Sequence, residues 1–154
     1  DSRNRQQPAA NGGFPMNLGD LINSRGVITL EPKRKDYAVE ELVDALGKRR
    51  EVTSKEKLRR AIKDREKILS TGIGSGIAVP HAKIAQVKSF CAVVGICKEG
   101  IDFSSQDGKP VQIIFMIAAT VSTATFGVTM LAYARIFTSD HRLRSAGELG
   151  IKLE

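Results

Sequence analysis

The sequence is poor in several residue types, and each shortage excludes a class of protein. It has no tryptophan, and aromatic residues make up only 5% of its 154 residues, so it lacks the stacking platforms of single-strand nucleic-acid binders. The formal net charge of +7 would suit nucleic acid, but without such platforms we expect no nucleic-acid partner. The two histidines and two cysteines have no metal-ligand spacing, so we expect no metal and no other cofactor.

The two cysteines, Cys91 and Cys97, lie six positions apart in one apolar run. On a strand they would share a face but would be too far apart to form a disulfide. We therefore expect two buried free thiols, which are typical of a protein in a reducing cytoplasm. The sequence also shows no secretory signal peptide, and we expect a cytoplasmic protein.

The remaining composition suits one soluble domain. Hydrophobic residues make up 42% of the chain and charged residues 27%, and this length suffices for a single hydrophobic core. Residues 1–15 are polar and contain proline and glycine, which predicts a disordered tail or linker. The domain would then comprise residues 16–154.

One stretch without charge requires a membrane span to be considered. Residues 110–134 include no charged side chain. Gly127 and several hydroxyl-bearing residues argue against a span. Apolar residues are continuous in the first half and spaced as on a helix in the second half, so the stretch predicts a buried strand followed by an amphipathic helix.

Strand and helix patterns alternate through the domain. Apolar residues three and four positions apart predict one helix over residues 37–49. A second helix is expected to begin at Thr53, because Glu56 follows three positions later, as in a capping box. The alternation predicts an α/β fold. Strands are expected at residues 27–30, 77–80, 89–97 and 111–119.

Residues 65–82, REKILSTGIGSGIAVPHA, combine a glycine-rich turn with a histidine. Backbone amides of such a turn can form an anion-binding nest, and the hydroxyls of Ser70, Thr71 and Ser75 add donors. His81 follows, and imidazole is the side chain that can act as a nucleophile at neutral pH without prior activation. Together these features predict phosphoryl chemistry at His81.

Arg65 strengthens this hypothesis, because it falls on the apolar stripe of the second helix, where a charge needs a partner or an anion. Alternatives remain open. Arg65 could extend past the edge of the core to water, and a histidine after a proline is usually a surface or core residue. The glycines form neither a Walker loop, since no Gly-Lys-Ser/Thr follows, nor a dinucleotide fingerprint, since an extended segment follows. The rest of the stripe comprises Leu58, Ala61, Ile62 and Leu69.

The REKILSTGIGSGIAVPHA run resembles the active-site segment of the IIA domains of the bacterial sugar phosphotransferase system, of the fructose, mannitol and nitrogen-regulatory type. IDFSSQDGKPVQIIFMIAA resembles a later strand pair of that family, so the resemblance covers about residues 16–135. It implies a single α/β domain, with a mixed β-sheet flanked by helices on both faces. It also implies that His81 accepts a phosphoryl group beside Arg65. The phosphoryl-binding residues would be Ser70, Thr71, Gly72, Gly74, Ser75 and Gly76.

The resemblance also implies protein partners. The donor would be an HPr-like histidine phosphocarrier protein, and the recipient an IIB-type acceptor domain or a regulatory target protein. The chain would then be a protein histidine phosphotransferase component. The surface around His81 should be partly apolar to fit these partners, with Ile73, Ile77 and Val79 as candidates.

One departure from the family pattern leaves two functions open. Family members commonly carry a second histidine at the start of the helix after the P-V-x-x-I-F strand, where this chain has Phe126 or Gly127. Neither side chain can donate a hydrogen bond. The chain could be a phosphocarrier in a sugar phosphotransferase relay that lacks one helper residue. Alternatively, it could be a regulatory binding module that uses His81 as a switch or retains it as a relic.

Overall fold

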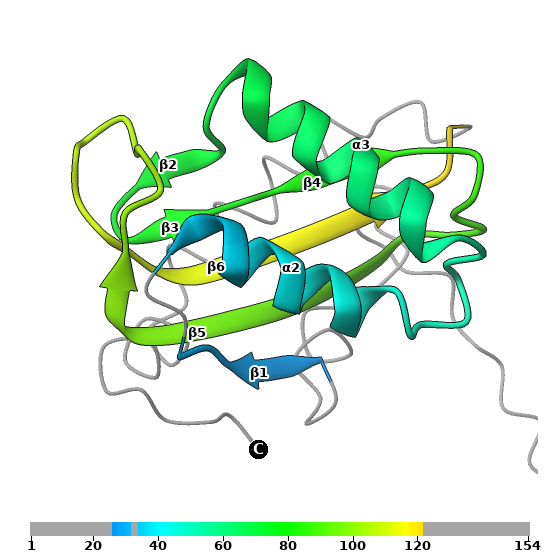
Figure 1. Ribbon diagram of the computed structural model, residues 1–154, viewed down its shortest axis with the longest axis horizontal. Coiled ribbons are helices and arrows are strands. Elements are labelled where there is room, and N and C mark those ends of the chain that lie inside the picture. Colours follow the sequence, from blue (N-terminus) through cyan, green and yellow to red (C-terminus); the bar gives the residue numbers. More distant parts are fainter. Residues whose placement is uncertain (1–25, 32–33, 122–154) are drawn as a thin grey trace, which may run out of the picture.

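The computed structural model describes residues 26–31 and 34–121, which form a mixed six-stranded sheet and two helices (Figure 1). The strands follow the order β1-β5-β6-β3-β2, and β4 also pairs with β6. The helices are α2 (Lys35–Leu46) and α3 (Lys55–Ile68). The strands are β1 (Val27–Thr29), β2 (Gly72–Gly74), β3 (Ile77–Ala78), β4 (His81–Lys83), β5 (Cys91–Ile101) and β6 (Val111–Ala119).

The long strands β5 and β6 form the centre of the sheet. They are antiparallel, while β1 runs parallel to β5. The strands β3 and β4 both run parallel to β6 and follow one another along it, with Ile77 opposite Ile113 and His81 opposite Ile117. Almost every residue of β6 is buried, which explains why its sequence is a continuous apolar run and does not alternate. The mixed α/β sheet confirms the predicted fold class.

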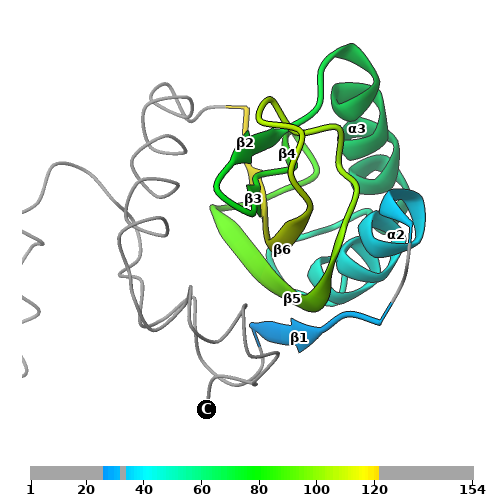
Figure 2. The same cartoon turned by 90° about the vertical axis from the view of Figure 1, so that its left-hand side faces the viewer.

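Both described helices pack on the same face of the sheet (Figure 2). Their apolar faces meet side chains of β5 and β6 in one core cluster, as their helical spacing predicts. The helix expected on the other face, after the β6 strand, lies outside the described residues. The buried helical residues are Ala38, Val39, Leu42, Val43, Leu46, Leu58 and Ile62.

The predicted capping box at the start of α3 is wrong by one residue. The N-cap is Ser54, whose Oγ accepts a hydrogen bond from the Lys57 amide at 3.3 Å. Thr53 cannot cap the helix, because its amide and its hydroxyl both donate to the carbonyl of Gln86, at 2.8 and 3.0 Å. Glu56 consequently does not bond back to the cap, and its carboxylate pairs with an arginine one turn later.

The end of α3 also differs from the prediction. The helix stops at Ile68, and Leu69 has an extended backbone with φ of −160°. Leu69 is therefore 62% exposed and does not belong to the buried stripe. The first helix, expected over residues 37–49, covers Lys35–Leu46 and ends at Gly47, whose amide donates to Val43.

The expected state of the two cysteines is confirmed. Cys91 and Cys97 are both free and buried in the core cluster. Burial raises the pKa of the Cys91 thiol to about 12, so this thiol stays protonated and unreactive. Within residues 26–31 and 34–121, no helix is both long and apolar enough to cross a membrane.

Candidate functional site

His81 is the first residue of β4 and directly follows Pro80. The Pro80 carbonyl accepts a hydrogen bond from Ile117 at 3.0 Å, which anchors the start of β4 on β6. The next residue, Ala82, is buried in the core cluster, whereas His81 is half-buried. The sequence predicted that His81 follows an extended segment. In the structure His81 is itself part of the sheet, because its strand β4 pairs with β6.

The ring of His81 is oriented by the backbone just before it. Its Nδ1 lies 2.8 Å from the carbonyl oxygen of Val79. Because a carbonyl oxygen only accepts hydrogen bonds, Nδ1 must carry the proton, and in the neutral ring the lone pair lies on Nε2. The Val79 amide in turn donates to the Thr71 carbonyl at 3.0 Å, which connects the ring to the segment before β2.

The surroundings of His81 favour its neutral form. Burial is the main cause that lowers its pKa, and the nearby charge of Arg65 lowers it further. The hydrogen bond to Val79 and the charge of Glu66 act in the opposite direction without cancelling the effect. The neutral form of the ring therefore predominates at pH 7.

Arg65 stands in the last turn of α3, and its charge is close enough to His81 to affect the pKa of the ring. Its Nη1 donates to the carbonyl of Leu69 at 2.8 Å. This bond holds the guanidinium against the chain that leaves α3. The structure thus brings together Arg65 and His81, which the sequence singled out, although sixteen positions separate them.

The hydroxyls of Ser70 and Thr71 already have partners within the chain. Ser70 donates to the carbonyl of Phe103, and its Oγ accepts from the Gly72 amide at 3.1 Å. Thr71 is only 5% exposed and donates its hydroxyl and its amide to the carboxylate of Glu66. Both hydroxyls therefore bind within the chain and fix the segment that supports His81.

The tip of the glycine hairpin lies apart from His81. Gly74, Ser75 and Gly76 have φ values of +93°, +56° and +78°, which closes the turn between β2 and β3. The following strand pairs with β6 four positions before His81 does, which corresponds to roughly 13 Å along a strand. The Ser75 amide donates to Asp107 at 3.0 Å, so this hairpin binds the loop before β6.

Gly72 has a packing role. A Cβ atom at this position would stand 2.3 Å from Oγ of Ser105, a buried side chain of the loop between β5 and β6. The Gly72 carbonyl accepts from the Gln106 amide at 3.4 Å. Hence the turn of the predicted site is placed by the loop at residues 102–109, and the glycine allows the close approach.

Sequence reasoning missed Glu66, whose carboxylate binds Thr71 and also pairs with Lys35 at 2.8 Å. A signal was available, because a carboxylate in the last turn of a helix opposes the helix dipole and needs a partner. Lys35 could not have been found this way. It stands on α2, and its ammonium also lies 4.5 Å from the centre of the Phe103 ring.

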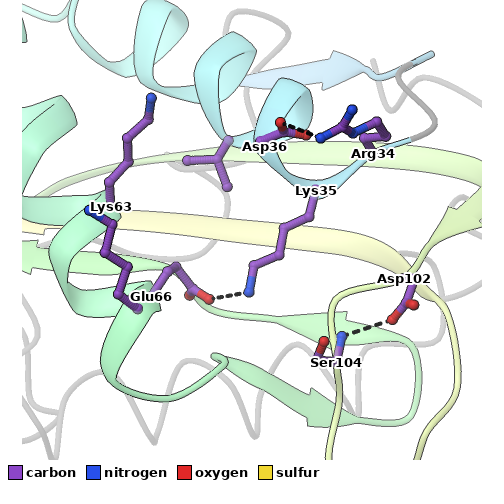
Figure 3. A pocket seen from close by; sticks show the side chains of 9 residues that line it. Arg34, Lys35, Asp36, Lys63, Glu66, Asp102 and Ser104 are labelled. Carbon is purple, nitrogen blue, oxygen red and sulfur yellow. Dashed lines mark hydrogen bonds and ion pairs between the residues drawn. The ribbon is translucent and has the colours of Figure 1, made fainter.

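The Lys35–Glu66 pair forms part of the wall of a cavity of about 680 Å³ (Figure 3). The cavity lies between the start of α2, the last turns of α3 and the residues after β5. Among the residues that the structure describes, no group of carboxylate, cysteine and histidine side chains could hold a metal ion. The other lining residues are Arg34, Asp36, Val39, Lys63, Lys67, Asp102 and Ser104.

Three large apolar side chains are exposed on the segment that runs from the end of α3 into β2. Ile68, Leu69 and Ile73 are 80%, 62% and 42% exposed. We call these three residues the apolar patch. Of the three candidates for an apolar surface, Ile73 is exposed as expected, but Ile77 and Val79 are buried in the sheet at 1% and 3%.

Comparison with known proteins gives consistent matches. The family model described as "Phosphoenolpyruvate-dependent sugar phosphotransferase system, EIIA 2" matches residues 21–145. The fructose-specific EIIABC component of Bacillus subtilis is 39% identical over 106 residues, which are 68% of this chain but only 17% of that protein. The fructose-specific EIIA component of Haloferax volcanii is 37% identical over 106 residues, 66% of this chain and 69% of that protein.

A solved structure confirms the fold. The nitrogen regulatory protein IIA-Ntr from Neisseria meningitidis superimposes with a TM-score of 0.74 at 26% identity. The match covers 85% of this chain and 90% of that one. The chain therefore has the single α/β domain that its sequence predicts.

Proposed function

This chain belongs to the EIIA type 2 family of the phosphoenolpyruvate-dependent sugar phosphotransferase system, and on that premise we propose that His81 is its phosphoryl acceptor. The donor is an HPr-like histidine phosphocarrier protein. The recipient is an IIB-type acceptor domain in a sugar phosphotransferase relay. The chain then acts as a protein histidine phosphotransferase component, with Arg65 as the second catalytic residue.

The orientation of the His81 ring is the observation that carries this proposal. Its Nδ1 lies 2.8 Å from the Val79 carbonyl, and burial lowers the pKa of the ring. These two facts support a neutral imidazole with its lone pair on Nε2. A nucleophile of this kind needs no base to remove a proton before attack.

The transfer itself follows from this arrangement. Nε2 forms a bond to phosphorus while the phosphorus–nitrogen bond of the donor breaks, and the electron pair of that bond returns to the donor imidazole. Nδ1 keeps its proton, and the positive charge that develops on the ring is stabilised by the Val79 carbonyl. Arg65 supplies planar donors for the phosphoryl oxygens. In-line transfer then depends on positioning more than on further covalent chemistry.

The apolar patch fits the need for protein partners. Ile68 and Leu69 are exposed within four positions of Arg65, whose Nη1 donates to the Leu69 carbonyl at 2.8 Å, and Ile73 is exposed on the following strand β2. A phosphocarrier must dock one partner, release it and dock the next at the same histidine. A small apolar surface beside the reacting group suits such short-lived contacts.

The proposal is tested by phosphoryl labelling. With phosphoenolpyruvate, the first enzyme of the relay and an HPr-like carrier, the chain should gain an acid-labile, base-stable phosphate. His81→Ala should remove this label, whereas His141→Ala, the matched control, should retain it. Label that persists in His81→Ala, or that maps to Ser70 or Thr71, would contradict the assignment.

A regulatory module is the second candidate. The likeness to a nitrogen regulatory protein over 85% of this chain favours it. In that case His81 would take phosphate, and its phosphorylation would change binding to a target protein. The two functions separate in one experiment. Labelled chain that loses its phosphate to IIB-type domains supports the relay, and labelled chain that passes phosphate to none of them supports regulation.

A further inference from the structure

We propose that Glu66, held by Lys35, is a positioning residue for His81. The pair lies on the helical side of the sheet and forms part of the cavity wall described above (Figure 3). Glu66 acts on His81 in two ways. Its charge raises the pKa of the ring against the effect of burial, and its hydrogen bonds position the ring through Thr71 and Val79.

The buried Glu66 carboxylate has three donors within the chain. Its side chain is 8% exposed, and its two oxygens accept from the hydroxyl of Thr71, from the amide of Thr71 at 3.3 Å and from Lys35. Three donors on one carboxylate fix its orientation, because each hydrogen bond limits how far the Glu66 side chain can rotate. Thr71 is therefore held from its side chain and its backbone at once.

Lys35 makes this arrangement stable away from water. Its ammonium lies 2.8 Å from Glu66 and over the Phe103 ring, and its side chain is only 28% exposed. Without the cation, a carboxylate this buried would be an unpaired charge. Since Lys35 is the first residue of α2 and Glu66 lies in the last turn of α3, the pair also joins the two helices next to the segment that supports His81.

One backbone hydrogen bond and one side-chain-to-backbone hydrogen bond connect Thr71 to His81. The carbonyl of Thr71 accepts from the Val79 amide at 3.0 Å, and the carbonyl of Val79 accepts from Nδ1 of His81 at 2.8 Å. The peptide groups on both sides of Val79 thus set the direction of the carbonyl that selects the Nδ1–H form of the ring. If Thr71 shifts, the Val79 carbonyl tilts, and Nε2 moves away from the line of attack.

Glu66→Gln tests the inference with almost no change in shape. Glutamine offers one acceptor oxygen and an amide nitrogen, so it cannot satisfy the Thr71 hydroxyl, the Thr71 amide and Lys35 together. We expect the share of the Nδ1–H form, measured by nitrogen NMR of the neutral ring at pH about 8, to fall. We also expect kcat for phosphorylation to fall roughly tenfold with an unchanged KM for the carrier.

The controls separate positioning from general damage. Asp64 also lies on α3, but its carboxylate faces solvent. The Asp64→Asn variant should therefore leave both the tautomer of His81 and kcat unchanged. Lys35→Met should act in the same direction as Glu66→Gln, and Lys35→Arg, which keeps the charge, should restore most of the original values. If Glu66→Gln does not fold, the Lys35 variants decide.

The measurement of kcat rests on the proposed function, because it requires that a carrier phosphorylates His81. The NMR measurement of the His81 tautomer does not depend on that function. If the original chain takes no phosphate from any carrier, the proposed function fails, and the NMR measurement still tests the positioning role. A Glu66→Gln chain whose tautomer and kcat match those of Asp64→Asn would overturn the inference. Lys35→Met and Lys35→Arg chains that behave alike would overturn it too.

Discussion

At the scale of single residues, the site depends on one ring nitrogen. The structure gives His81 a fixed partner on Nδ1, and burial lowers the pKa of the ring, so the proposed nucleophile needs no neighbouring base. The sequence could indicate His81 and Arg65, because both stand in a local pattern. It could not indicate the tautomer, which depends on where the Val79 carbonyl points after folding.

The lowered pKa of His81 predicts a particular pH dependence. Because burial, the main cause, holds the pKa below its usual value of about 6.5, phosphorylation should stay constant from pH 8 to 7. It should decline only as the pH falls through that lowered pKa. The same shift stabilises the fold above the unfolded-state pKa, and this contribution is lost as the pH falls through the folded-state pKa.

Proton NMR titration of the His81 ring measures this pKa directly. The midpoint should lie below that of an unstructured histidine peptide in the same buffer. A midpoint above the peptide value would show that the charge of Glu66 and the bond to Val79 outweigh burial. In that case the neutral ring would be less populated at pH 7 than that of a free histidine, against the proposal.

Arg65→Lys tests the guanidinium separately from its charge. The variant keeps the positive charge that acts on the pKa of His81, but it loses the planar set of donors. Since a charge-assisted hydrogen bond contributes about 1.5–3 kcal/mol, labelling should slow at least roughly tenfold. Circular dichroism should show an unchanged fold, and a normal labelling rate would mean that Arg65 only packs.

At the scale of elements, local patterns predicted both helices and the strands β1, β3, β5 and β6, but they missed β2, β4 and the ends of the elements. The apolar runs of β5 and β6 and the spacing in α2 depend on burial, which sequence expresses directly. The cap of α3 depends on Thr53 meeting Gln86, which is 33 positions away. Likewise, the separation of the glycine hairpin from His81 depends on how β3 and β4 register on β6. Such long-range pairings leave no local pattern.

The shifted cap gives a stability prediction. Ser54→Ala should destabilise the domain by about 1 kcal/mol, because it leaves the Lys57 amide without its acceptor at the start of α3. Glu56→Gln should cost well under half of that, because the Glu56 carboxylate is 67% exposed and pairs with an arginine in solvent. Urea unfolding of both variants measures the difference. If Glu56→Gln lowered the free energy of unfolding more than Ser54→Ala does, the result would support the capping box at Thr53 instead.

At the scale of the whole molecule, parts distant in sequence cooperate on one histidine. α3 contributes Arg65 and Glu66, α2 contributes Lys35, and the loop after β5 holds the segment before β2 through Phe103. The apolar patch lies on the segment where α3 passes into β2, and the same segment is held by Glu66 through Thr71 and by Phe103 through Ser70.

The speed of the whole carrier is the property that decides between flux and signalling. By resemblance, the family has a second histidine where this chain has Phe126 or Gly127, which lie outside the described residues. A missing charge-assisted hydrogen bond costs about 1.5–3 kcal/mol, or roughly tenfold to a hundredfold in rate. We therefore expect slow phosphorylation by family standards, a rate that suits regulation better than sugar transport.

Rate measurements with one carrier test this expectation on the original chain, Phe126→His and Gly127→His. If the second histidine of the family corresponds to Phe126 or Gly127, one of these two variants should be phosphorylated faster than the original chain. The control His141→Ala, which alters the other native histidine, should not change the rate. Arg65 and the oriented His81 ring would be sufficient by themselves if the original chain already transferred phosphate at transport speed. The missing histidine would then carry no cost, because the phosphoryl charge would be fully stabilised without it.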